Sequence, residues 1–190
     1  MIRYTQDRMI VLGMVPVRRD MFPPEPSIAL KDRVVKRFEE MAESNGDIRL
    51  VTIDAVVDGG MLWDLRDVGK VVDLFRAEKV DAIVFPHCNF GQEEVVAKTA
   101  AEIGKPVLIW GPRDPSPETD QSGKTGPRDF DTQCGMFATS RALRHFRHGR
   151  CGRDRHPAKE NAPYRQKKTA GWTARCWTVV LKNSCGWLPL

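Results

Sequence analysis

The stretch that decides the fold is AIVFPHCNFGQEEVVAKTAAEIGKPVLIWGP, residues 82–112. It starts with a short apolar run, continues with apolar side chains repeated at helical spacing, and has a second β-type run at residues 106–110. A buried strand, a helix and another buried strand in this order are typical of a parallel sheet covered by helices. The stretch therefore predicts one strand–helix–strand unit of an α/β fold.

The same alternation continues on both sides of this unit. It predicts strands at residues 9–17 and 48–53, and helices at residues 27–45, 62–75 and 130–146. Four βα units with right-handed crossovers give a doubly wound parallel sheet of the flavodoxin-like or Rossmann-like type. The expected strand order is 2-1-3-4.

Two details of these helices are also predicted. Ser27 is the expected N-cap of the first helix, because its hydroxyl suits the free N–H groups of a first turn. The spacing of apolar residues predicts the inner face of the last helix, which consists of Cys134, Phe137, Ala138 and Ala142.

The predicted fold lacks its fifth strand. Residues 148–190 contain few large aliphatic side chains, too few to offset the entropy of ordering a chain of that length, so we expect a disordered tail. The chain is thus divided into an α/β domain at residues 1–147 and a basic tail at residues 148–190. Because Arg, Cys and Trp are frequent in the tail and share G- and C-rich codons, we interpret it as an out-of-frame continuation.

The charge is unevenly distributed between these parts. Residues 1–143 contain 19 Lys and Arg against 23 Asp and Glu, whereas residues 144–190 contain 11 against 2. The basic excess therefore belongs to the tail and does not indicate a nucleic-acid site in the domain. The polar start and the absence of a run of 18 apolar residues predict a cytoplasmic protein without a membrane segment.

Four motifs on the predicted strand and helix ends carry a resemblance to a known family. They are GMVPV (13–17), FPHCNFGQEE (85–94), KPVLIWGPRD (105–114) and DTQCG (131–135). In this order they resemble the amino-terminal domain of the L-fucose isomerase and L-arabinose isomerase superfamily. The resemblance covers residues 10–146, so the chain is interpreted as a fucose-isomerase-like protein truncated or frameshifted after about residue 147.

The resemblance implies a metal-dependent aldose–ketose isomerase that works as a homo-oligomer. In that family a divalent metal, typically manganese, is held by later domains, so this chain is expected to hold no cofactor and to be inactive by itself. The first domain contributes a wall of the sugar pocket and oligomer contacts. The substrate-binding residues implied here are Arg18, Arg19, His87, Cys88, Asn89, Phe90, Gln92 and Arg113. Two positions depart from the family, since Cys88 stands where a pocket tryptophan is found and Val15 where an arginine is found.

Plainer interpretations of these residues stay open. His87 and Cys88 also fit loop residues that pack over the sheet, and residues 89–91 also fit the turn that begins a helix. Residues 123–126, GKTG, lack the spacing of a phosphate loop, and His145, His148, Cys151 and His156 form no regular metal motif. The alternative function is a non-catalytic flavodoxin-like binding module whose basic tail binds nucleic acid or an acidic partner.

Overall fold

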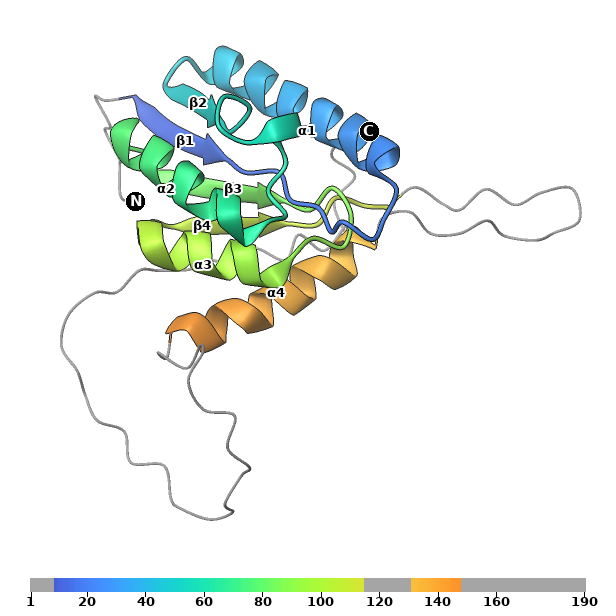
Figure 1. Ribbon diagram of the computed structural model, residues 1–190. Helices are drawn as coiled ribbons and strands as arrows, with labels where there is room; N and C mark the ends of the chain where they lie inside the picture. Colours follow the sequence, from blue (N-terminus) through green and yellow to red (C-terminus); the bar gives the residue numbers. More distant parts are fainter. Residues whose placement is uncertain (1–8, 115–130, 148–190) are drawn as a thin grey trace, which may run out of the picture.

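A computed structural model describes residues 9–114 and 131–147 of the chain. In this part, four strands alternate with four α helices, as the sequence predicts (Figure 1). The elements in chain order are β1 (Ile10–Met14), α1 (Pro24–Asn45), β2 (Ile48–Thr52), the short 3-10 turns η1 (Asp58–Gly60) and η2 (Leu65–Asp67), α2 (Val68–Ala77), β3 (Ala82–Pro86), α3 (Glu93–Ile103), β4 (Val107–Trp110) and α4 (Thr132–Arg147).

The four strands form one parallel sheet in the order β2-β1-β3-β4, which confirms the predicted order. Leu12 of β1 lies opposite Leu50 of β2 and Ala82 of β3. Beyond the end of β1 the pairing continues, since Val17 forms parallel bridges with both Leu62 and His87. The loops after β1, β2 and β3 are therefore held together at the carboxyl edge of the sheet.

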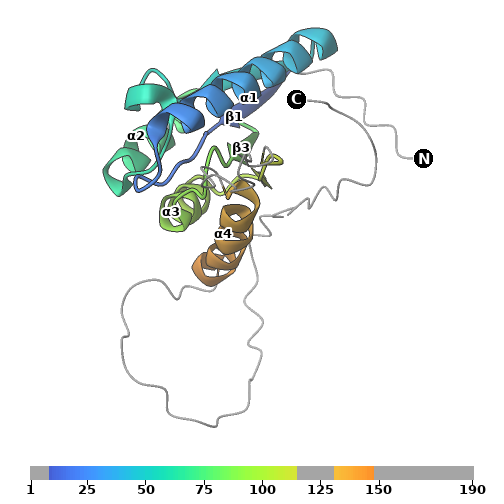
Figure 2. The same ribbon diagram turned by 90° about the vertical axis from the view of Figure 1, so that its right-hand side faces the viewer.

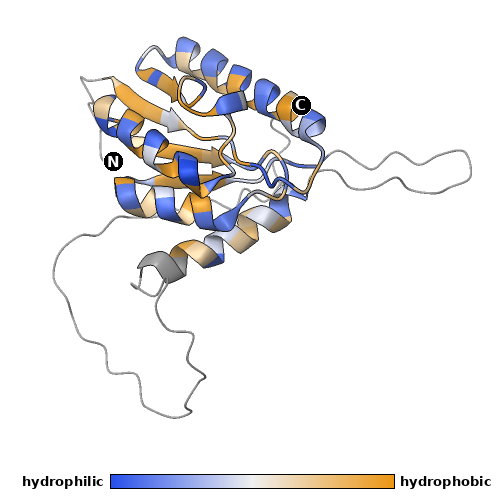
Figure 3. Ribbon diagram, viewed as in Figure 1, coloured by the Kyte–Doolittle hydropathy of each residue, from blue (hydrophilic) through white to orange (hydrophobic). Residues whose placement is uncertain are grey.

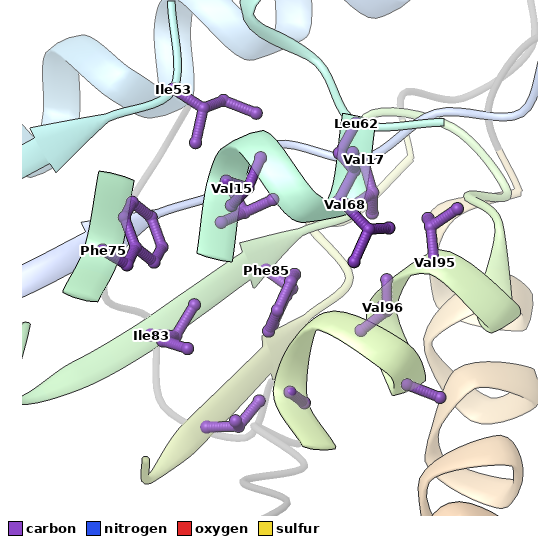
Figure 4. Close-up of a cluster of buried hydrophobic side chains, with 14 of the residues drawn as sticks. Val15, Val17, Ile53, Leu62, Val68, Phe75, Ile83, Phe85, Val95 and Val96 are labelled. Carbon is purple, nitrogen blue, oxygen red and sulfur yellow. The ribbon is translucent and has the colours of Figure 1, made fainter. Parts of the chain in front are cut away.

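Helices cover both faces of the sheet. Figure 2 shows α1 on one side, with α3 and α4 on the other. Side chains of α2, α3 and α4, including Phe75, Val96 and Met136, share one hydrophobic core with the strands. The close-up in Figure 4 shows Val15, which follows β1, and Phe85 of β3 within this core. The apolar strands and the polar outer surfaces of the helices are visible in Figure 3.

The start of α1 differs from the prediction. The helix begins at Pro24 instead of after Ser27, and its N-cap, Pro23, makes no side-chain capping bond. A proline is tolerated in the first turn because the N–H that it lacks has no helical acceptor there. Ser27 is fully buried, and its hydroxyl accepts a hydrogen bond from Asn89. The predicted role of Ser27 as a cap is therefore wrong.

The second helix is shorter than the sequence predicts. It starts at Val68, whereas helical spacing predicts a start at Leu62. The backbone N–H of Leu62 instead donates to the carbonyl of Pro16 at 2.8 Å, which extends the sheet pairing of the β1 loop. Leu62 is buried as an extended residue, and Leu65 is partly exposed in η2.

The predicted inner face of α4 is partly wrong, because Ala142 packs against the core and Ala138 is half-buried but the other two predicted residues are exposed. Cys134 is exposed and Phe137 is 55% exposed, whereas Met136, Thr139 and Leu143 are buried. The contact that sets the rotation of the helix is made by Gly135, where a Cβ atom would lie only 1.6 Å from the carbonyl oxygen of Phe90. Because only glycine fits against this backbone, the helix turns Phe137 outward.

Strand β4 is the edge of the sheet within the described residues. Val107 and Ile109 point into the core, whereas Leu108 and Trp110 are half-buried on the side of α1. The ring of Trp110 lies 5.8 Å, centroid to centroid, from that of Phe38. The tail at residues 148–190 and the loop containing residues 123–126 lie outside the described residues, as do the side chains of His145 and the histidines that follow it.

Candidate functional site

The carboxyl ends of β1 and β3 form the centre of the candidate site. The backbone N–H of Val17 donates to the carbonyl of Pro86, and the N–H of Cys88 donates to the carbonyl of Val17, both at 2.9 Å. In an open parallel sheet, ligands bind outside this edge because the loops there diverge and leave a crevice. The structure thus brings the loop with Arg18 and Arg19 next to the loop with residues 87–92.

Asn89 connects these two loops to α1. Its amide oxygen accepts from the backbone N–H of Arg19 at 2.6 Å and from that of Gly91 at 3.0 Å. Its amide nitrogen donates to the carbonyl of Arg19 at 3.2 Å and to the hydroxyl of Ser27 at 3.0 Å. All the hydrogen-bonding capacity of the fully buried amide is used in this way. Asn89 therefore fixes the position of Arg19 from below.

The Arg19 side chain lies across the start of α3. Its Nε donates to the carbonyl of Gly91 at 2.9 Å, and its terminal nitrogen is paired with the carboxylate of Glu93. The guanidinium lies over the ring of Phe90, 4.4 Å from the ring centroid. These contacts hold the partly exposed side chain in one orientation.

Arg18 reaches in a different direction. Its guanidinium lies 4.8 Å from the ring centroid of Trp63, and it is 3.3 Å from a carboxylate oxygen of Asp20. The loop that contains Trp63 follows β2 and is held to the β1 loop, since the N–H of Arg18 donates to the carbonyl of Leu62 at 3.3 Å. The two arginines thus join three loops at one edge of the sheet.

A pocket of about 300 Å³ opens between these loops. Two of the sequence-predicted site residues, Arg19 and Gln92, line this pocket. Five lining residues are absent from the predicted set: Asp20, Met21, Trp63, Asp64 and Leu65. A hydrogen bond from Arg66 lowers the pKa of the Asp64 carboxyl below its usual value, so this carboxylate is ionised at neutral pH.

His87 lies beneath this surface and is fully buried. Its Nδ1 is 3.0 Å from the carbonyl oxygen of Phe90, so Nδ1 carries the proton and donates. Its Nε2 has no hydrogen-bond partner among the described residues. Burial lowers the pKa of the imidazole from 6.5 to about 4, so the ring is neutral at physiological pH.

Gly91 closes the space above the imidazole. Its φ of +75° is in the left-handed region, and a Cβ atom there would lie 2.5 Å from Nδ1 of His87. Both the backbone conformation and the close approach therefore require glycine. The turn between β3 and α3 is built tightly over the ring.

Cys88 points to the opposite face of the sheet. It is fully buried, and burial raises the pKa of its thiol from 9.0 to about 12. A thiol in this state is protonated and is a weak nucleophile at neutral pH. His87, Cys88 and Asn89 present no exposed surface, so Arg19 and Gln92 are the predicted residues that a ligand in the pocket would contact. Substrate binding by the three buried residues stays a prediction.

The remaining two predicted residues lie apart from the pocket lining. Phe90 is partly buried below Arg19, and Arg113 is exposed beyond the end of β4. Asp114 accepts a hydrogen bond from the N–H of Thr132 at 3.2 Å, which connects the end of β4 to the start of α4. The sequence motif after β4 therefore contributes to the joining of elements, and a role of Arg113 in substrate binding stays a prediction.

A metal ion would need several ligands close together. Among residues 9–114 and 131–147, no three His, Cys, Asp or Glu side chains gather as a metal site requires. Divalent cations such as manganese prefer several oxygen ligands, and Asp20 and Asp64 are the only two carboxylates in the pocket lining. The described residues therefore do not fit a resident metal. In the same parts of the chain, no helix has the length and apolar character needed to cross a bilayer.

Comparison with known proteins gave one family. Residues 13–180 match the family described as fucose/sulfoquinovose isomerase, N-terminal domain. The matched range contains all the pocket residues and extends beyond residue 147, so the division of the chain at that residue stays a prediction. A search of curated proteins and a search of solved structures both gave no match.

Proposed function

The chain belongs to the fucose/sulfoquinovose isomerase N-terminal domain family, and from this membership we propose that its pocket forms one wall of the sugar site in an aldose–ketose isomerase. The pocket lies where open α/β sheets bind their ligands. Its lining combines an aromatic ring with carboxylate, amide and guanidinium groups.

The observation that carries this proposal is that Trp63 lines the same pocket as Asp20, Asp64 and Gln92. A sugar ring has apolar C–H faces and a rim of hydroxyl groups. An indole offers a flat apolar surface for such a face, and carboxylate and amide groups accept or donate hydrogen bonds at the rim. The combination suits a small polyol better than it suits an apolar ligand.

In this proposal, the domain binds and orients the sugar, and the chemistry belongs to residues outside the described ranges. Aldose–ketose interconversion needs a group that moves a proton between two neighbouring carbons and a polarised oxygen. The neutral imidazole of His87 and the protonated thiol of Cys88 are both enclosed. We assign the divalent metal, with manganese as the expected ion, to another part of the enzyme.

The surface around the pocket supports a role in a homo-oligomer. Met21 and Leu65 both line the pocket, and they are 78% and 39% exposed. Exposed apolar side chains that gather beside a site are typical of surfaces covered by another protein surface. We propose that a second copy of the enzyme covers this rim and completes the sugar site.

The proposal is tested by following the indole N–H signals of the full ¹⁵N-labelled chain during titration with neutral aldoses and ketoses. The Trp63 signal is expected to shift at millimolar sugar, and the Trp110 signal, which belongs to the Phe38 contact, is the internal control. Trp63→Ala should weaken binding about fivefold, the value of a lost aromatic contact. If the Trp63 signal does not move at saturating sugar, the pocket is not a sugar site.

A further inference from the structure

Both arginines at the pocket are already paired with a carboxylate of the same domain. Arg19 pairs with Glu93 and also donates to the carbonyl of Gly91. Arg18 pairs with Asp20 at 3.3 Å, and Trp63 covers its guanidinium face. A negatively charged ligand group would have to displace one of these internal partners before it could use either arginine.

Each charged group in the pocket lining already has a partner of opposite charge. Arg19 is paired with Glu93, Asp20 with Arg18 and Asp64 with Arg66, so the lining has no unpaired cation for an anionic ligand. Asp64 is paired with Arg66 and stays ionised, and Asp20 is 68% exposed, so its oxygens are open to a ligand. A hydroxyl group can donate to these oxygens, whereas a sulfonate or phosphate can only be repelled by them.

We propose that this pocket selects a neutral sugar over an anionic one, and that Glu93 and Asp20 determine this preference by acting as internal counterions of Arg19 and Arg18. The inference rests on the proposed sugar site and specifies the substrate class for it. The family description includes both a neutral deoxy sugar, fucose, and a sulfonated sugar, sulfoquinovose. The charges at the pocket place this chain with the neutral class.

The apolar residues of the pocket agree with this assignment. Met21 and Leu65 line it together with Trp63. A methyl or another uncharged end of a sugar can lie against such side chains at little cost, because it gives up few hydrogen bonds with water. A sulfonate at the same place would lose its hydrating water molecules, and it would find both arginines already paired with carboxylates.

The test compares 6-deoxyglucose with sulfoquinovose, which has the same ring and adds one sulfonate, and includes L-fucose as a second neutral probe. Dissociation constants are measured on the full chain from the Trp63 indole and Gln92 side-chain amide signals. The neutral sugars should bind at least about fivefold more tightly than sulfoquinovose, because one charge interaction at a partly exposed site has about this value.

Glu93→Gln is the decisive variant because it removes the counterion and leaves Arg19 in place. It should reduce the ratio of the dissociation constants of the sulfonated and the neutral sugar about fivefold. Glu94→Gln is the matched control, since the exposed Glu94 lies in the same first turn of α3, and it should leave the ratio within about twofold. Asp20→Asn should act in the same direction as Glu93→Gln and serves if that variant does not fold.

The outcomes separate this inference from the function on which it rests. Equal or tighter binding of sulfoquinovose to the unmodified chain would overturn the preference for neutral sugars and leave the sugar site intact. A ratio unchanged in both Glu93→Gln and Asp20→Asn would overturn their role as counterions. Failure of all three sugars to shift the Trp63 signal would reject the sugar site itself.

Discussion

Acidification should destabilise the domain through His87 before its carboxylates are protonated. Burial lowers the imidazole pKa to about 4 in the folded state, whereas an unfolded histidine has a pKa of about 6.5. The unfolded chain therefore binds a proton that the folded chain does not bind as the pH falls from about 6.5 to about 4. The stability provided by neutral His87 is complete above about pH 6.5 and is lost through this window.

The size of the effect follows from the two pKa values. Each pH unit between them is worth about 1.4 kcal/mol, so the full window corresponds to about 3 kcal/mol. Between pH 7.5 and pH 5, where most carboxylates remain ionised, His87 alone should remove about 2 kcal/mol from the free energy of unfolding. Urea unfolding followed by far-UV circular dichroism at both pH values measures this loss.

The variant His87→Gln isolates the contribution of the imidazole. Glutamine does not titrate, and its amide retains a donor for the carbonyl of Phe90. The variant should be less stable at pH 7.5 but should lose about 2 kcal/mol less than the unmodified chain on going to pH 5. The other three histidines are present in both proteins and cancel in the comparison.

A direct titration makes the reasoning refutable even if the variant fails to fold. The Cε1–H resonance of His87 in the unmodified chain should keep its neutral chemical shift down to about pH 5 and move only near about pH 4. A midpoint near 6.5 would show that the ring is not enclosed as described. Equal pH-dependent losses in the variant and the unmodified chain would refute the linkage.

Two further predictions concern α4 and the thiols. Gly135→Ala should destabilise the domain by about 3 kcal/mol or more in urea unfolding, because the new Cβ would overlap the carbonyl of Phe90. Gly69→Ala in α2, where nothing lies within 4 Å of the new atom, should be neutral or stabilising. Equal effects of the two changes would contradict the packing argument. Iodoacetamide at pH 8 should label the exposed Cys134 under native conditions and label Cys88, with a pKa of about 12, only after denaturation; peptide mass mapping reads both sites, and native labelling of Cys88 would show that the loop after β3 opens.

The arrangement of the sheet is predictable from sequence because each strand is a short apolar run bounded by turn residues. The positions that fail are those where a distant backbone decides. Leu62 has helical spacing with Leu65 and Val68, yet its N–H pairs with Pro16 in the β1 loop. Periodicity describes which side chains share a face, but it does not show which neighbouring segment uses the backbone.

The rotation of α4 is a second example of the same limit. Phe137 is a large apolar residue, so sequence analysis places it inside, but the structure exposes it. The face is chosen by a glycine, which has no hydrophobicity to reveal it. Gly135 marks the inner side because the Phe90 backbone approaches it closely, and a sequence pattern contains no sign of that approach.

The candidate site shows a similar division between what residue types suggest and what the fold does with them. His87, Cys88 and Asn89 attract attention by their chemistry, and all three are fully buried. Trp63 and Asp64 line the pocket, although the spacing of apolar residues predicts a helix at these positions. A signal was present: the loop after the second strand lies next to the loop after the first in a 2-1-3-4 sheet, so an aromatic–acidic pair there belongs to the same edge.

The buried residues and the pocket residues depend on each other. Two hydrogen bonds of Asn89 fix the backbone of Arg19, and its other two hold Gly91 and Ser27. The bond from His87 to the carbonyl of Phe90 fixes the turn beneath the guanidinium. A cation held in one orientation before a ligand arrives loses little entropy on binding. Because this support lies below the surface, Glu93→Gln and Asp20→Asn would change the charge at the proposed sugar site while Asn89 still holds the Arg19 backbone.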